Sequence, residues 1–352
     1  MARFMIATLT MAALLGAALV SNGAWGDVWA LAALLGITVG VFALDQLAAL
    51  AAPDQPGEAF PAGDGLAVAL GLLHFPLLFG GVWAVAGGGG HDATARVALF
   101  FALGLFLGQV GNSNAHELIH RPDRGLRRLG IAVYSSLLFG HHVSAHLRVH
   151  HVHAATDADP NSAPLGQSYY AFAPRAWIGS FRQGLRAETA LRRRASARRG
   201  PHPYGIYAGG AVLSLGLAWL LAGGAGMLAL FGLCAYAQAQ LLLSDYVQHY
   251  GLRRRELAPG RREPVGPQHS WNAPMPASSA LMLNAPRHSD HHARPARPYP
   301  GLEIDRTAMP ILPHALPVMA VLALIPPVWR RLMDRRARRW SGARGQTQRG
   351  GP

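Results

Sequence analysis

The sequence predicts an all-α integral membrane protein with six transmembrane helices and a cytoplasmic, histidine-rich helical cap. Of its 352 residues, 51% are hydrophobic and 14% are charged, whereas a soluble protein carries about a quarter charged residues. The apolar residues lie in long blocks, and about 20 apolar residues suffice for a helix to cross a bilayer. Several of the 17 histidines gather just beyond these blocks.

Six apolar blocks are expected to span the membrane: residues 4–20, 28–51, 66–86, 97–112, 206–221 and 227–243. The 32 basic residues are all arginine, and nearly all of them fall in residues 119–205 and 248–352. Because loops rich in basic residues tend to stay on the cytoplasmic side, both segments and both termini are expected in the cytoplasm. The expected location is the bacterial inner membrane, with the lipid bilayer as a partner and no nucleic acid.

These spans divide the chain into five parts. Residues 1–118 hold the first four spans and end in a first histidine motif. Residues 119–205 form a cytoplasmic segment with a second motif, and residues 206–247 hold the last two spans. Residues 248–306 carry a lone histidine and a third motif. Residues 307–352 combine a proline-broken apolar segment, expected at the membrane interface, with a basic tail.

Nine histidines form four groups on the expected cytoplasmic side. They are His116 and His120 in H-E-x-x-H, His146, His150 and His151 in H-x-x-x-H-H, the lone His249, and His288, His291 and His292 in H-x-x-H-H. Residues four apart share a face of an α-helix, so His146 and His150 are expected side by side, with His151 about 100° around the helix. The third motif is expected on one helix face.

The first motif has the zinc-protease pattern, yet a catalytic zinc uses three protein ligands, which would leave six histidines without a role. Nine neutral imidazoles suit two metal ions with four or five nitrogens each and with positions open for oxygen and substrate. Imidazole alone suits zinc, copper, iron or nickel, so the spacing leaves the metal undecided. A metal transporter would place its ligands at mid-membrane, where only His74 and Asp45 lie.

Few carboxylates accompany these histidines. Glu117, Asp159, Asp245 and Asp290 are expected to accept the second ring N–H of a metal-bound histidine, which fixes its orientation. Asp45 lies inside the second expected span, where an ionisable group is costly and usually functional or paired. We expect Asp45 to shape a substrate cavity or to hold helices together.

Four segments resemble the membrane alkane 1-monooxygenase family within the fatty acid desaturase and hydroxylase superfamily: NAHELIHRP, GHHVSAHLRVHHVHAATDADPNSAPLGQS, DYVQHYGL and RHSDHHARPARPYP. The resemblance covers about residues 30–302. It implies a non-haem di-iron site, with two iron ions, the nine histidines as ligands and no further catalytic residue. It implies hydroxylation of a terminal C–H bond of an alkane or similar lipophilic substrate by dioxygen, with electrons from a soluble rubredoxin or ferredoxin and its reductase.

The chain departs from this family at three positions near the histidines. Ala145 and Gln248 stand where the family has glutamate, and Asp245 stands where it has asparagine. No ligand is changed, but the departures remove or relocate carboxylates near the site, so two alternatives stay open: a fatty-acyl or other lipid desaturase or hydroxylase, and an alkylarene (xylene-type) methyl monooxygenase. Cys234 is the single cysteine, so no iron-sulfur centre is expected within this chain and the electron donor is expected to be external.

Overall fold

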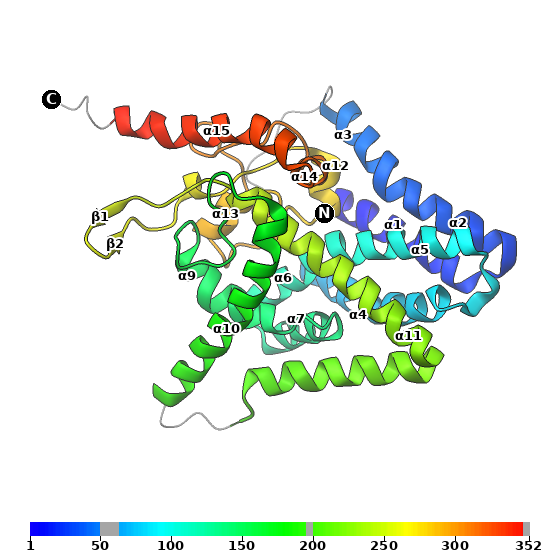
Figure 1. Cartoon of the computed structure of the whole chain (residues 1–352). Coiled ribbons are helices and arrows are strands. Elements are labelled where there is room, and N and C mark those ends of the chain that lie inside the picture. The colour runs from blue at the N-terminus through cyan, green and yellow to red at the C-terminus, as the bar shows by residue number, and fades with distance from the viewer. Residues whose placement is uncertain (50–62, 195–199, 348–352) are drawn as a thin grey trace.

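The computed structural model describes residues 1–49, 63–194 and 200–347, and most of these residues are helical (Figure 1). The first part of the chain contains α1 (Ala2–Val20), α2 (Gly23–Leu35), η1 (Gly36–Gly40), α3 (Val41–Ala49), α4 (Gly63–Val85), η2 (Gly88–Gly90), α5 (Ala93–Phe106), η3 (Leu107–Gly111) and α6 (Asn112–His120). The middle contains α7 (Arg124–Ser136), α8 (His141–Ala145), η4 (His146–His150), α9 (His151–His153), α10 (Tyr169–Arg194) and α11 (Pro203–His249).

The last part contains one small hairpin and several short helices. These are β1 (Glu256–Ala258), β2 (Arg261–Arg262), η5 (Pro267–His269), α12 (Pro276–Leu281), α13 (His288–Ala293), η6 (Tyr299–Gly301), α14 (Leu316–Ala323) and α15 (Pro326–Thr347). The two strands pair antiparallel. Segments η1, η3 and η4 are π-helical, and η2, η5 and η6 are 3₁₀-helical.

Five helices among the described residues are long and apolar enough to cross a membrane: Ala2–Val20, Gly23–Ala48, Asp64–Val85, Ala93–His120 and Pro203–His249. The second of these joins α2, η1 and α3, and the fourth joins α5, η3 and α6. Each of the six expected spans falls largely within one of the five helices. The end of the expected span 28–51 lies outside the described residues.

Helix α11 contains both of the last two expected spans, which is why five helices are found rather than six. Its backbone leaves the helical conformation at Ala222 (φ −153°) and at Gly223 (φ +56°). A positive φ suits glycine because glycine has no Cβ. Figure 1 shows α11 reversing its direction at the far right, so that its two arms form a hairpin.

The long helices expose apolar side chains over much of their length. Val20, Val212, Leu220 and Leu228 are 81%, 68%, 81% and 74% exposed. Continuous apolar surface of this kind marks contact with lipid or with another protein, and here it covers the helices that have the length and composition of membrane spans. The chain is therefore a membrane protein.

The histidine-bearing elements meet at the other end of these helices. Figure 1 shows α6, α9 and α13 near one another, next to the end of the second arm of α11. The segment expected as a basic tail instead forms α15 over residues 326–347. Trp329, Met333 and Ala337 are buried, and because they are four residues apart they form one packed face. The Trp329 ring lies 5.5 Å from that of Tyr246 and 5.2 Å from that of Tyr250.

Candidate metal centre

Helix α6 presents the first two histidines. His116 and His120 are one turn apart, with ring centroids separated by 4.9 Å. The helix ends at His120 because Arg121 is extended (φ −70°, ψ 141°) and precedes Pro122, and a residue before proline avoids the α conformation. The pair therefore lies at the end of an apolar helix, as the sequence predicted.

The second motif lies on a π-helical turn, which changes which histidines share a side. His146–His150 form η4, between α8 and α9. A π-helix is closed by i→i+5 hydrogen bonds, so residues five apart lie on the same side. His146 and His151 consequently belong together, with ring centroids 4.5 Å apart. His146 and His150 were expected side by side, and their ring centroids are 5.3 Å apart, but the two residues belong to different histidine groups.

The third motif is also divided. His288 and His292 are one turn apart on α13, with ring centroids 4.6 Å apart, and His249 at the end of α11 lies 4.9 Å from His288. His291 points elsewhere and lies 4.4 Å from His116. The three rings lie close together, as expected of positions i, i+3 and i+4 on one helix face, with His291 5.9 Å from His288 and 5.7 Å from His292. The motif is nevertheless divided, because His291 faces the histidines of α6.

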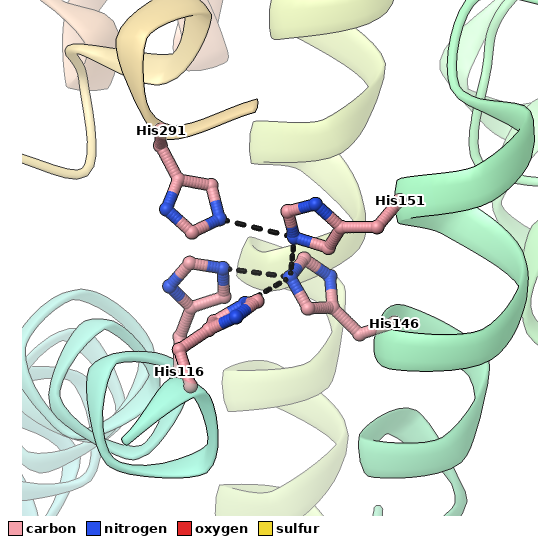
Figure 2. A group of neighbouring side chains, drawn as sticks. His116, His146, His151 and His291 are labelled. Carbon is pink, nitrogen blue, oxygen red and sulfur yellow. Dashed lines mark hydrogen bonds between the residues drawn. The ribbon is translucent and has the colours of Figure 1, made fainter. Parts of the chain in front are cut away.

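All nine histidines gather into two adjacent groups. The five-histidine group contains His116, His120, His146, His151 and His291, and Figure 2 shows how the rings of His116, His146, His151 and His291 converge. The four-histidine group contains His150, His249, His288 and His292. Within each group, one nitrogen from every residue lies within 4.8 Å of the others. The groups are neighbours, because the rings of His151 and His292 are 4.7 Å apart.

The nitrogen positions fit a bound cation better than a hydrogen-bond network. The Nε2 atom of His146 lies 2.8 Å from Nε2 of His116, 3.0 Å from that of His120 and 2.9 Å from that of His151 (Figure 2). One ring nitrogen carries at most one hydrogen, so these four atoms cannot satisfy one another as hydrogen bonds. A metal ion accepts all of their lone pairs.

Five of the six site histidines outside the long apolar helices are also held in the neutral form that binds metal. Burial, followed by the charges of neighbouring imidazoles, lowers the pKa of His146, His151 and His291 well below the usual value. The same causes lower the pKa of His288 and His292. Since metal ligation requires neutral imidazole, these rings are ready to bind at neutral pH.

Asp159 is the carboxylate that orients a histidine of this site. Its Oδ2 atom lies 2.9 Å from Nδ1 of His150, and Nε2 of His150 has no hydrogen-bond partner among the described residues. Burial alone would raise the pKa of Asp159, but the charge and hydrogen bond of His150 and a hydrogen bond from Ser162 hold it at about 2. The arrangement directs Nε2 of His150 into the four-histidine group, as expected of an outer-shell carboxylate.

The other three carboxylates do not contact these histidines in the described part of the chain. Glu117 pairs with Arg121 at 2.9 Å and accepts the Tyr299 N–H. Asp245 accepts a hydrogen bond from Asn161 at 2.6 Å. Asp290 pairs with Arg294 and with Arg297. The expectation for Glu117, Asp245 and Asp290 is therefore corrected, because nearby arginine or amide donors satisfy them.

An apolar cavity of about 360 Å³ leads to both histidine groups. His116 and His146 of the five-histidine group and His288 of the four-histidine group form part of its wall. Apolar residues of η1, α3, α11 and α14 contribute to the rest of the wall. Asp45 also lines the cavity, and its Oδ1 atom accepts the N–H groups of Ala277 and Ser278 at 2.7 and 3.0 Å, which joins α3 to the start of α12.

Several polar residues of this cavity wall were not identified as site residues from the sequence, among them Gln109, Asn112, Tyr134 and His142. A signal for the first two was present. Gln109 and Asn112 at the end of an expected span and His116 just beyond it follow one another at intervals of three and four residues, a spacing that puts them on one helix face. Polar residues in an apolar span that point the same way as a metal ligand indicate a functional cavity.

Comparison with known proteins agrees with this site. The model of the fatty acid desaturase family matches residues 92–322, which include every histidine of both groups. Alkane 1-monooxygenase 2 of Pseudomonas aeruginosa is 34% identical over 276 residues, covering 76% of this chain and 73% of that protein. Alkane 1-monooxygenase 1 of the same species is 34% identical over 287 residues, covering 78% and 74%.

A more distant relative is the hydroxylase component of the xylene/toluene monooxygenase of Pseudomonas putida. It is 27% identical over 223 residues, covering 61% of this chain and 57% of that protein. The match to the family model and the similarity to the two Pseudomonas aeruginosa enzymes extend over most of the chain. The chain therefore belongs to the fatty acid desaturase family and, within it, to the alkane 1-monooxygenases, a group of oxidoreductases.

Proposed function

We propose that this enzyme hydroxylates a terminal C–H bond of an alkane or a similar hydrophobic molecule with dioxygen, using two iron ions held by the nine histidines. The observation that carries the proposal is the meeting of two nitrogen-only groups with one apolar cavity, whose wall contains His116, His146 and His288. A molecule in this cavity lies beside both groups.

The proposed ligands divide five and four between the two ions, as the two histidine groups do. Nitrogen-only sites accept several metals, and the choice of iron rests on the family to which the chain belongs. When bound, the two irons supply the reduction and activation of dioxygen that attack on an unactivated C–H bond requires. Outside the ligands, no further catalytic residue is proposed.

The protein's own contribution is positioning and exclusion of water. The cavity walls hold the hydrocarbon with its end toward the histidines, and a well-oriented reactant removes much of the entropic part of a barrier. The buried neutral rings keep their lone pairs directed at the two proposed metal positions. Asp159 keeps the Nδ1 hydrogen of His150 in place, so that Nε2 remains the ligating atom.

We further propose six membrane crossings, because the turn at Ala222 and Gly223 makes two arms of α11. The other four long helices bring the total to six. The two arms of α11 separate the two histidine-bearing segments, and two crossings return the chain to the same side of the membrane. The arginine-rich segments favour the cytoplasmic side of a bacterial inner membrane. An apolar substrate then enters from the bilayer, while water-soluble reactants arrive from the cytoplasm.

The electrons are proposed to come from a soluble rubredoxin or ferredoxin and its reductase. Cys234 is the single cysteine of the sequence, and it is buried without a disulfide. Arginines occupy the outer face of α15, where Arg330, Arg331 and Arg335 are exposed. A basic surface favours encounter with an acidic partner.

Metal content and product analysis test the proposal. Purified protein is expected to contain about two irons per chain, whereas one zinc per chain would contradict the di-iron assignment. Cells that produce the chain with a rubredoxin and its reductase are expected to convert octane to 1-octanol. Release of an unsaturated product instead would favour the desaturase alternative, which the family model keeps open.

An alkylarene methyl group is the second candidate substrate. The similarity to the xylene/toluene monooxygenase component, 27% identical over 223 residues, favours it. Parallel feeding with octane and p-xylene separates the two. Preference for p-xylene at equal concentration would assign the enzyme to methyl groups on rings.

A further inference from the structure

Two amide side chains in the cavity wall have unused hydrogen-bond acceptors. Gln109 and Asn112 both line the cavity and are 9% and 5% exposed. Among the described residues, neither Oε1 of Gln109 nor Oδ1 of Asn112 has a hydrogen-bond partner. Leaving such a buried acceptor unsatisfied costs about 1–3 kcal/mol, so these positions are unfavourable next to a plain hydrocarbon.

The orientation of the Asn112 amide is fixed by its other end. Its Nδ2 atom donates to the carbonyl oxygen of Ala237 on α11 at 2.9 Å, so the NH₂ group must face α11 and Oδ1 must face away from that bond. Asn112 precedes His116 by one turn, about 6 Å along the helix axis. An acceptor therefore lies one helical turn from a proposed metal ligand, in the same cavity.

The chemistry of the missing partner follows from the amide oxygen. It accepts hydrogen bonds and donates none, which excludes hydrocarbons, aldehydes and ionised carboxylates as partners. A hydroxyl group can donate, and the rest of the molecule that carries it must be apolar to match the remaining wall.

We propose that Asn112, assisted by Gln109, binds the hydroxyl group of a hydrocarbon alcohol in this cavity. The inference rests on the proposed function. The alcohol has two possible sources: the product of alkane hydroxylation, or a second substrate that enters with its hydroxyl group already present. In the second case the distal methyl C–H is replaced by C–OH, the other oxygen atom leaves as water, and the soluble donor system supplies two electrons with two protons from solvent.

Asn114 provides a matched control on the same helix. It is 2% exposed, its Nδ2 atom donates to the Ala67 carbonyl at 2.9 Å, and its Oδ1 atom lacks a partner in the described part of the chain. It differs from Asn112 in that it does not line the cavity. Asn114→Leu and Asn112→Leu therefore remove the same groups, and only the second removes an acceptor from the cavity.

The test uses iron-loaded full-length enzyme in lipid nanodiscs with three measurements. These are the ratio of kcat/KM for 1-octanol to that for octane, inhibition of octane turnover by 1-octanol, and the rise in Tm that 1-octanol produces. Asn112→Leu is expected to weaken the response to 1-octanol about five- to tenfold, the effect of one lost hydrogen bond, and Asn114→Leu is expected to leave it unchanged. Gln109→Met repeats the test with a smaller loss if Asn112→Leu folds poorly.

Each outcome is decisive. Formation of octane-1,8-diol that depends on Asn112 supports a hydroxylated substrate, and inhibition without diol that depends on Asn112 supports product binding. The inference would be overturned if Asn112→Leu and Asn114→Leu responded equally to 1-octanol. It would also be overturned if neither Gln109→Met nor Asn112→Leu changed that response, and water would then be the partner of these acceptors. Failure of the proposed function is distinct, because octane would then remain unoxidised by the unaltered enzyme.

Discussion

The two histidine groups lie side by side yet are built differently. Every member of the four-histidine group is buried, and one member is oriented by a carboxylate, Asp159. In the five-histidine group, His116, His120 and His151 are only partly buried, and no carboxylate contacts a member within the described residues. The four-histidine group therefore has fewer nitrogens but is fully buried and held by a carboxylate. The five-histidine group has one nitrogen more and is less tightly enclosed. We infer that the four-histidine group tolerates substitution less well.

Removal of one ligand from each group gives the largest expected contrast. His249→Ala leaves three nitrogens in its group, so about one iron per chain and loss of hydroxylation to background are expected. His120→Ala leaves four, so both irons are expected to remain, with partial activity. Iron analysis and octane turnover measure both, and His153→Ala, which changes an exposed histidine outside the groups, is the control. Equal losses in the two variants would contradict the difference between the groups.

The orienting carboxylate is expected to matter less than a ligand. Asp159→Asn removes the charge that holds His150, and loss of such a partner typically costs 10–100-fold in metal affinity or activity. Glu117→Gln changes another buried carboxylate, whose partners are Arg121 and Tyr299. Metal titration should show weaker iron binding for Asp159→Asn and near-normal binding for Glu117→Gln. Weak binding in both would restore Glu117 as a residue that orients a ligand.

Stability of the metal-free protein is expected to fall with acid. Burial lowers the pKa of His142, His146, His151, His288, His291 and His292. The unfolded chain, with imidazole pKa about 6.5, therefore binds more protons than the folded chain below that pH. Each such histidine removes up to about 1.4 kcal/mol of unfolding free energy per pH unit as pH falls below about 6.5.

His150 has the opposite sign. Burial would lower its pKa, but the Asp159 carboxylate raises it overall, so His150 contributes stability that is present below pH 6.5 and lost above its raised pKa. The histidines whose pKa is lowered outnumber His150, so the net effect of acid is destabilising. Thermal unfolding of metal-free protein from pH 8 to pH 5 should show a falling Tm, and a constant or rising Tm would show that the rings are not held neutral.

Asp45→Asn is expected to have the smallest effect. Asp45 connects α3 to the start of α12, whose chain continues to α13 and its histidines. Asparagine keeps an acceptor oxygen but loses the charge, so a cost of about 1 kcal/mol in unfolding free energy is expected. Thermal unfolding should show a small decrease in Tm with two irons still bound. A changed preference among alkane chain lengths, at unchanged Tm, would instead show that Asp45 acts mainly on substrate.

The sequence predicted the participants of the site far better than their arrangement. All nine histidines were identified because they fall in closely spaced motifs and because two of the four groups directly follow apolar blocks. Two groups of four or five nitrogens were expected, but which histidine belongs to which group was not predicted, because it depends on the π-helical turn at His146–His150, which no spacing rule for α-helices anticipates. Asp159 lies nine residues from His150, and only the folded turn after α9 brings the two together.

The positions of the apolar helices followed from composition, but the number of separate helices depended on one turn within α11. Ala222 and Gly223 lie in a glycine-rich stretch that the sequence marks as a break, yet the helix resumes at once. The arginines of residues 330–339 suggested a solvated tail. The buried positions of Trp329, Met333 and Ala337 are spaced like an ordinary packed helix, a pattern obscured by the charged residues between them.

The wide turn at His146–His150 makes the chemistry of this enzyme sensitive to chain length as well as to side-chain identity. A turn closed five residues apart contains one residue more than an α-helical turn. Deleting Val149 alone would leave every metal-binding side chain in the sequence. The turn would shorten by one residue, however, so His150 and His151 would each move around the helix toward the other histidine group. One centre would then lose a nitrogen to its neighbour. We expect relatives to tolerate replacement at this position and not omission.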